Sequence, residues 1–180
     1  YWTPAQNLPD DSRKRLVFSG CHMRDFETLD RVIERVVSMR EDVEFVLVSP
    51  EKECGRLYRR RNVRWLYRIP DDEYLRVMQN ATLLVLPLKY STAVNTVLEA
   101  LACGIPVVTT RGGISDYLDD TCSLQFDRGD GEGMAKSILE LLDSPKTVAE
   151  MRSAARRKAL EFSWPKVAEQ IRRLVNERFA

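Results

Sequence analysis

The chain has 180 residues, of which 44% are apolar and 31% are charged, and its formal net charge is +1. This length suits one domain that buries about 70% of its unfolded surface, and the balanced charge excludes the broad basic field of a nucleic-acid-binding protein. No apolar run approaches the roughly 20 residues that a transmembrane helix needs, and the four cysteines lack the spacing of disulfide or metal motifs. We therefore expect a soluble cytoplasmic protein in a reducing compartment.

Short apolar runs alternate with helical patterns along the whole chain. In chain order, the expected strands cover residues 15–20, 43–49, 63–67, 82–86, 105–109 and 122–126. The first expected helix follows Asp25 as N-cap, the second covers residues 51–60, and Asp71 or Asp72 is expected to cap the third. A fourth helix opens at Asn95, and three more follow the last strand.

This alternation predicts the fold. Strands this apolar belong to a parallel sheet that is covered on both faces, and right-handed crossovers make it a doubly wound, Rossmann-like α/β domain. Residues 1–14 carry four breakers and read as a linker, so the domain itself is expected at residues 15–180. The breakers are Pro4, Pro9, Asp10 and Asp11.

Ligands of such a sheet bind beyond the carboxyl ends of its strands. The loops expected there cover residues 20–24, 68–71, 88–96 and 110–116. The first of them lacks the GxGxxG pattern, which argues against a dehydrogenase. The helix that opens with Asn95 and Thr96 offers free backbone N–H groups and a favourable dipole to a phosphate, and Glu99 follows on the same helix face. The loop and helix together suit a nucleoside diphosphate.

The segment from Leu98 to Val108 reads Leu-Glu-Ala-Leu-Ala-Cys-Gly-Ile-Pro-Val-Val. It resembles the donor-binding signature of retaining GT-B-fold glycosyltransferases of the glycosyl transferase group 1 family. The resemblance runs from about Arg15 to the C-terminus and covers the second of the two domains in such an enzyme. It implies metal-independent transfer, without a cofactor, from a nucleoside-diphosphate sugar. The acceptor, a glycan, lipid or small molecule, would bind an N-terminal domain that this chain lacks, and the isolated domain would be inactive.

In this family the first loop holds the donor diphosphate with a glycine and the basic residues after it. Gly20 matches the glycine, whereas Cys21 stands where an arginine is usual. The resemblance therefore implies that Arg24 binds the diphosphate and acts in catalysis, with His22 as a weaker candidate. A guanidinium can bind phosphate in a bidentate manner. Ion pairing with local acids is the alternative for Arg24, and an incidental loop position is the alternative for His22.

Many members carry two glutamates separated by seven residues, and the second of them binds the ribose. Glu99 matches the second glutamate, and Ser91 occupies the position of the first. The resemblance thus implies a ribose-binding and catalytic role for Glu99, for which a mere helix-dipole contribution is the alternative. Lys89 is a further phosphate candidate or else a solvated lysine, and Arg68 and Ile69 lie where the family holds the nucleobase.

Three other features have two interpretations each. Gly112 and Gly113 resemble a glycine pair of the family that lets the backbone pass close to a ligand, or they form a plain turn. Phe162-Ser163-Trp164 resembles a box before the last helix, which in the family often crosses to the other domain and would leave apolar surface exposed here. A cluster of arginines forms a solvated face or contacts an anionic membrane or partner, which would place the protein at the inner membrane surface. The cluster comprises Arg56, Arg59, Arg60, Arg61 and Arg64.

Other functions remain as alternatives. A GT-B-fold epimerase shares the architecture but generally lacks the block around Glu99, and no convincing pyridoxal lysine supports a phosphorylase. The departures at Cys21 and Ser91 keep open a non-catalytic nucleotide-binding or interaction module. A flavodoxin-like domain would not explain the match from Glu99 to Val108.

Overall fold

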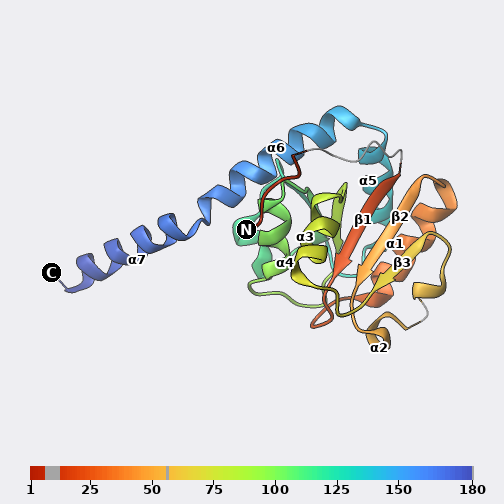
Figure 1. Ribbon diagram of the computed structural model, residues 1–180, viewed down its shortest axis with the longest axis horizontal. Coiled ribbons are helices and arrows are strands. Elements are labelled where there is room, and N and C mark those ends of the chain that lie inside the picture. The colour runs from red at the N-terminus through yellow and green to blue at the C-terminus, as the bar shows by residue number, and fades with distance from the viewer. Residues whose placement is uncertain (7–12, 56, 180) are drawn as a thin grey trace.

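The computed structural model describes residues 1–6, 13–55 and 57–179 (Figure 1). Its single sheet has six strands, all parallel, in the order β3-β2-β1-β4-β5-β6. The strands are β1 (Lys14–Ser19), β2 (Val43–Val48), β3 (Val63–Leu66), β4 (Leu83–Leu86), β5 (Val107–Thr110) and β6 (Ser123–Phe126). The predicted doubly wound α/β fold is confirmed.

Helices cover both faces of the sheet, as right-handed crossovers require. The longer helices are α1 (Phe26–Met39), α3 (Asp71–Gln79), α4 (Asn95–Ala102), α5 (Gly131–Leu142), α6 (Pro145–Glu161) and α7 (Trp164–Phe179). Helix α1 packs against α5 and helix α4 against α6 (Figure 1). All four residues of β4 are buried, as are all four of β5. This burial explains why β4 is uniformly apolar and why the polar residues of β5 are threonines, whose side chains are small.

The structure corrects three local predictions. The helix expected over residues 51–60 is split into α2 (Glu51–Cys54) and a 3₁₀ turn, η1 (Leu57–Arg59), because Gly55 adopts a left-handed conformation with φ +52° and ends α2. Helix α3 is preceded by Pro70 as N-cap, and both Asp71 and Asp72 lie in its first turn, where they favour the dipole without a capping bond.

The third correction concerns the start of the domain. Lys14 already belongs to β1 and pairs with Val43, so the strand begins one residue earlier than predicted. Pro9, Asp10 and Asp11 of the expected linker lie outside the described residues. The first residues of the chain contact the domain, since Gln79 donates a hydrogen bond to the carbonyl of Thr3 at 2.9 Å.

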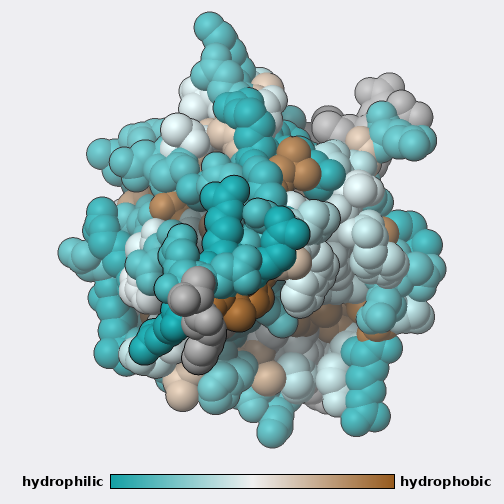
Figure 2. Space-filling model, turned by 90° about the vertical axis from the view of Figure 1, so that its left-hand side faces the viewer, coloured by the Kyte–Doolittle hydropathy of each residue, from teal (hydrophilic) through white to brown (hydrophobic). Residues whose placement is uncertain are grey.

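Helix α7 projects from the body of the domain (Figure 1). Its exposed apolar side chains confirm the surface expected there, and they comprise Trp164, Ile171, Leu174 and Val175. Figure 2 looks at the molecule from this side and shows small apolar areas scattered over a mostly hydrophilic surface. Along the described ranges, none of the helices combines the length and the hydropathy needed to cross a membrane.

The predicted Asp25 cap is present at the start of α1. The buried Asp25 carboxylate accepts hydrogen bonds from the Thr28 amide at 3.1 Å and from the Thr28 hydroxyl at 2.8 Å. We expect Asp25→Ala to lower the free energy of unfolding by about 1 kcal/mol, as loss of an N-cap typically does. Urea denaturation would measure this change. Asp25→Asn keeps a capping oxygen and should retain most of the stability, and equal losses in both variants would contradict the capping role.

Candidate functional site

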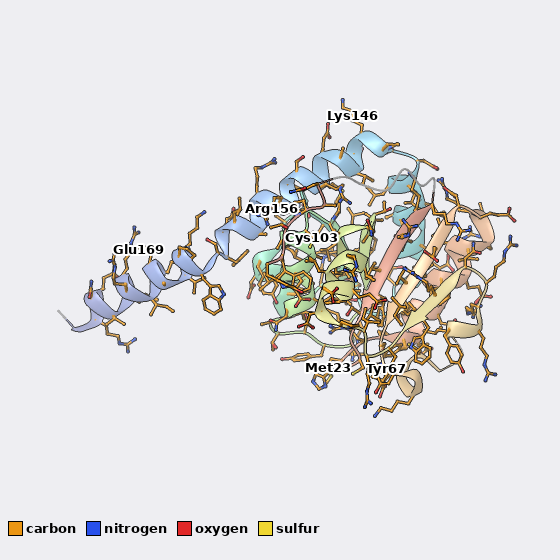
Figure 3. The ribbon with its side chains drawn as sticks, viewed as in Figure 1. Met23, Tyr67, Cys103, Lys146, Arg156 and Glu169 are labelled. Carbon is orange, nitrogen blue, oxygen red and sulfur yellow. The ribbon has the colours of Figure 1, made fainter. Side chains whose placement is uncertain are left out.

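The candidate site lies where the strand order reverses, between β1 and β4. The loop after β1 and the loop after β4 are joined there by a bridge between Arg24 and Leu88, and the Lys89 amide donates to the carbonyl of Met23 at 2.9 Å. Figure 3 shows Met23 and Tyr67 at the same end of the domain, away from α7. Because all six strands are parallel, the structure brings the four predicted loops to one edge of the sheet.

Arg24 is a half-buried cation without an acidic partner among the described residues. Its Nε donates to the Ser19 carbonyl at 2.9 Å and its Nη1 to the His22 carbonyl at 3.1 Å. Burial lowers the pKa of Arg24. Gly20 has φ +91°, and a Cβ atom built on it would lie 2.9 Å from Arg24 Nη2, so the glycine gives the guanidinium room. The predicted alternative, an ion pair with local acids, is not what these contacts show.

The other residues of this loop differ from Arg24. Cys21, His22 and Met23 are exposed, and Met23 has φ +57°. The His22 side chain is therefore not fixed by burial. Lys89 is also exposed, which favours the solvated-lysine alternative.

No described side chain caps the start of helix α4, so its first amides have no side-chain acceptor. The N-cap residue is Val94, which has no polar side-chain atom, and the Val97 amide bonds back to the Val94 carbonyl at 3.0 Å. The amides of Asn95 and Thr96 precede that bond and point out of the helix start. This end of the helix therefore carries the positive end of the dipole without a side-chain cap.

Glu99 lies one turn further along and is half-buried. Its Oε2 is 3.3 Å from the hydroxyl of Tyr74, which is also 2.9 Å from Ser19 Oγ. Burial raises the pKa of Glu99, and the Tyr74 hydrogen bond acts in the opposite direction. Ser19 and Tyr74 were not predicted. Ser19 could have been found as the last residue of a strand that ends at the site, whereas no pattern distinguishes Tyr74.

Ser91 does not face open space. Its side chain is buried, and its hydroxyl accepts a hydrogen bond from the Ile114 amide at 3.4 Å. A Cβ atom on Gly112 would lie 2.8 Å from Ser91 Oγ, and one on Gly113 would lie 2.8 Å from the Ser91 carbonyl oxygen. The glycine pair thus admits the neighbouring loop, and neither glycine has a left-handed φ. Ser91 packs against this loop, and its contact with the donor stays a prediction.

The segment after β3 carries an aromatic and cationic stack. The Arg68 guanidinium lies 5.0 Å from the centroid of the Tyr67 ring, and Tyr67 stacks on Trp65 with centroids 6.0 Å apart. Arg68 is exposed with φ +53°, whereas Ile69 packs partly into the core. Arg68 therefore presents a flat, charged surface at the sheet edge, and Ile69 offers mainly its backbone.

Most of the predicted arginine cluster is neutralised by acids. Arg60 pairs with Asp30 and Glu34, and Arg61 pairs with Glu41 at 2.8 Å. Arg64 approaches Glu44 at 3.8 Å, Arg59 stacks over the Tyr58 ring at 5.6 Å, and Arg56 lies outside the described residues. These pairings favour the solvated-face alternative over a basic patch for an anionic membrane.

The family of this chain follows from its similarity to known proteins. The model of the glycosyl transferases group 1 family matches residues 13–144. The chain belongs to this family. Its matched part contains β1 to α5, and thus every residue of the candidate site described above.

Relatives of this group 1 glycosyltransferase chain include two bacterial enzymes. A GDP-mannose-dependent monoacylated alpha-(1-6)-phosphatidylinositol monomannoside mannosyltransferase of Corynebacterium glutamicum is 26% identical over 94% of this chain and 51% of its own length. An alpha-maltose-1-phosphate synthase of Mycobacterium tuberculosis is 32% identical over 89% of this chain and 47% of its own length. The chain therefore spans about half the length of these relatives.

Solved structures agree on the fold. A crystal structure of TarM matches with a TM-score of 0.82 and 21% identity, over 97% of this chain and 37% of that one. The C-terminal domain of a glycosyl transferase group 1 family protein, LpcC of Francisella tularensis, matches with a TM-score of 0.75 and 13% identity, over 88% and 94% of the two chains. The group 1 chain thus has the architecture of a GT-B second domain.

Proposed function

We propose that this chain is the donor-binding domain of a retaining glycosyltransferase and binds a nucleoside-diphosphate sugar. The observation that carries the proposal is the meeting of three groups at the β1/β4 reversal: Arg24, which has no acidic partner among the described residues, the uncapped start of α4, and the Glu99 carboxylate. A cation and free amides suit a diphosphate, and a carboxylate suits ribose hydroxyls. One TarM structure of the same fold is described as a complex with UDP.

The proposed reaction breaks the bond between the anomeric carbon and the diphosphate. Arg24 and the amides of Asn95 and Thr96 would stabilise the charge that develops on the departing diphosphate, without a metal ion or cofactor. Glu99 would fix the ribose and so orient the donor, and Arg68 and Ile69 would border the base. The acceptor would attack from the face that the leaving group vacates, which retains the anomeric configuration.

The acceptor half of the site belongs to a proposed N-terminal domain. The curated relatives are about twice as long as this chain. The match with the LpcC domain covers 88% of this chain and 94% of that domain. The acceptor would be a glycan, a lipid or a small molecule bound by that other domain, with residues 1–14 as part of the connection. We expect no transfer by this chain alone, and turnover with a simple acceptor would contradict this arrangement.

Calorimetric titration of the domain with UDP, GDP, ADP and dTDP tests the proposal. We expect one nucleotide to bind preferentially and Glu99→Ala to weaken that binding at least about tenfold, because a hydrogen bond to a charged group contributes about 1.5–3 kcal/mol. Glu140→Ala, a change of equal charge on exposed α5 surface, is the matched control. Absence of binding to wild type, both in the domain and in the full-length protein, would favour the non-catalytic module.

A further inference from the structure

Tyr74 connects two parts of the candidate site that are far apart in the sequence. It belongs to α3, and its hydroxyl lies 2.9 Å from Ser19 Oγ at the end of β1 and 3.3 Å from Glu99 Oε2 on α4. Among the described residues, the Tyr74 hydroxyl is the hydrogen-bond partner of the Glu99 side chain. The orientation of Glu99 therefore depends on a residue of α3 whose hydroxyl also contacts Ser19 and the Thr96 side chain.

The direction of these hydrogen bonds follows from the groups involved. An ionised carboxylate can only accept, whereas tyrosine and serine hydroxyls can each donate one proton and accept others. Tyr74 therefore donates its single proton to Glu99, and Ser19 can donate to the Tyr74 oxygen. Burial raises the pKa of Tyr74 to about 12, so the hydroxyl keeps its proton throughout the neutral range. Within the described part of the chain, Oε2 of Glu99 is the oxygen that is engaged, which leaves the second carboxylate oxygen for a ligand.

The Tyr74 ring is held from its other side. Trp2 meets it edge to face, with ring centroids 5.5 Å apart and an interplanar angle of 83°. Arg156 on α6 in turn donates to the Trp2 carbonyl at 3.3 Å. Aromatic contact of this geometry restricts the ring, and a restricted ring fixes the place of its hydroxyl.

We propose that Tyr74 is a positioning residue that holds the Glu99 carboxylate in the orientation needed to accept the ribose hydroxyls of the donor. The inference rests on the proposed function, in which Glu99 binds the ribose. Without Tyr74, the half-buried carboxylate loses the hydrogen bond to its charged form and can rotate about its own side-chain torsions. Through Glu99, Tyr74 thus affects the binding of ligands that carry ribose hydroxyls.

This restriction provides the test. The probes are whichever of UDP, GDP and ADP the wild-type domain binds, and the 2′,3′-dideoxy analogue of the same nucleotide. The measured quantity is the ratio of the two dissociation constants. We expect Glu99→Ala to abolish the preference for the ribonucleotide. Tyr74→Phe should reduce the preference about three- to tenfold, because Tyr74 acts indirectly and its effect is smaller than that of a direct hydrogen bond to a charged group.

Tyr117→Phe is the matched control. Tyr117 also has a hydrogen-bonded hydroxyl, which accepts from the Val94 amide at 2.8 Å and donates to the Thr92 carbonyl at 2.9 Å, but it does not contact Glu99. Its loss can weaken both ligands together through the start of α4, and we expect the ratio to stay unchanged. Thermal unfolding of each variant checks that the fold persists.

The outcomes separate the two proposals. If Glu99→Ala leaves the ratio intact, or wild type shows no preference at all, the ribose role of Glu99 fails and the role of Tyr74 fails with it. If Glu99→Ala abolishes the preference but Tyr74→Phe leaves it intact, only the positioning role is overturned. Equal weakening of both ligands by Tyr74→Phe would likewise overturn it, because that result shows a general structural effect.

Discussion

Replacing Arg24 with methionine is expected to weaken binding of a nucleoside diphosphate roughly 10- to 100-fold, since a hydrogen bond to a charged group contributes about 1.5–3 kcal/mol. The guanidinium is half-buried, donates only to the Ser19 and His22 carbonyls, and pairs with no acid among the described residues. Its positive charge is therefore available to a ligand, and a diphosphate is the part of the proposed donor that carries charge. Methionine keeps an unbranched side chain without the charge.

The ligand series makes this expectation specific. The affinity lost through Arg24→Met should be largest for the diphosphate, smaller for the monophosphate and absent for the nucleoside, as calorimetry can measure. Arg24→Lys keeps the charge without the planar fork and should fall between wild type and Arg24→Met. Arg76→Met, on the exposed surface of α3, is the charge-matched control. An equal loss for all three ligands would show that Arg24 only supports the loop.

Stability should respond differently from binding. Burial lowers the pKa of Arg24 because the charged form loses solvation without gaining a carboxylate partner. Arg24→Met removes that desolvation cost together with two hydrogen bonds to carbonyls, so we expect the unfolding temperature to change little. A site residue whose charge serves a ligand and is not needed for the fold is what the proposed role requires. A large fall in the unfolding temperature would indicate a structural role.

The sheet could be predicted because burial on both faces leaves a direct trace in the sequence. Residues 83–86 are all apolar and all buried, whereas a half-exposed strand typically alternates apolar and polar residues. The prediction of one helix over residues 51–60 was wrong because Gly55 ends that helix. A glycine within a helical pattern gives no sign in the sequence of the φ angle that it adopts. Local periodicity therefore predicts which elements exist better than where they end.

Within the site, the spacing of Asn95 and Glu99 predicts a helix start with a carboxylate one turn later, and the structure has both. The contacts of Glu99 could not be predicted, because Tyr74 and Ser19 reach it only through the packing of α3 and β1 against α4. Ser91 shows the same limit. Its place in the family motif suggests a position facing the donor, whereas its burial against the glycine pair depends on where the loop after β5 runs.

Gly113→Ala is expected to destabilise the domain by about 1–3 kcal/mol, as overpacking of a well-packed site typically does. A Cβ atom there would lie 2.8 Å from the Ser91 carbonyl oxygen and 3.2 Å from Thr92 Cα, so the backbone of the loop before α4 must shift. The same loop is joined to this region by the bond between the Val94 amide and the Tyr117 hydroxyl. We therefore also expect weaker nucleotide binding, measured by titration beside urea denaturation.

The neighbouring glycine supplies the control for this explanation. A Cβ atom on Gly112 would meet Ser91 Oγ, the end of a side chain that can rotate, so Gly112→Ala should cost less than Gly113→Ala. Ser91→Ala removes that oxygen and should restore Gly112→Ala, but it cannot restore Gly113→Ala, because there the obstacle is backbone. If Ser91→Ala restored both variants or neither, close packing against Ser91 would not be the reason for the glycine pair. The selective rescue would show instead that the glycines are required by the loop that carries the start of α4.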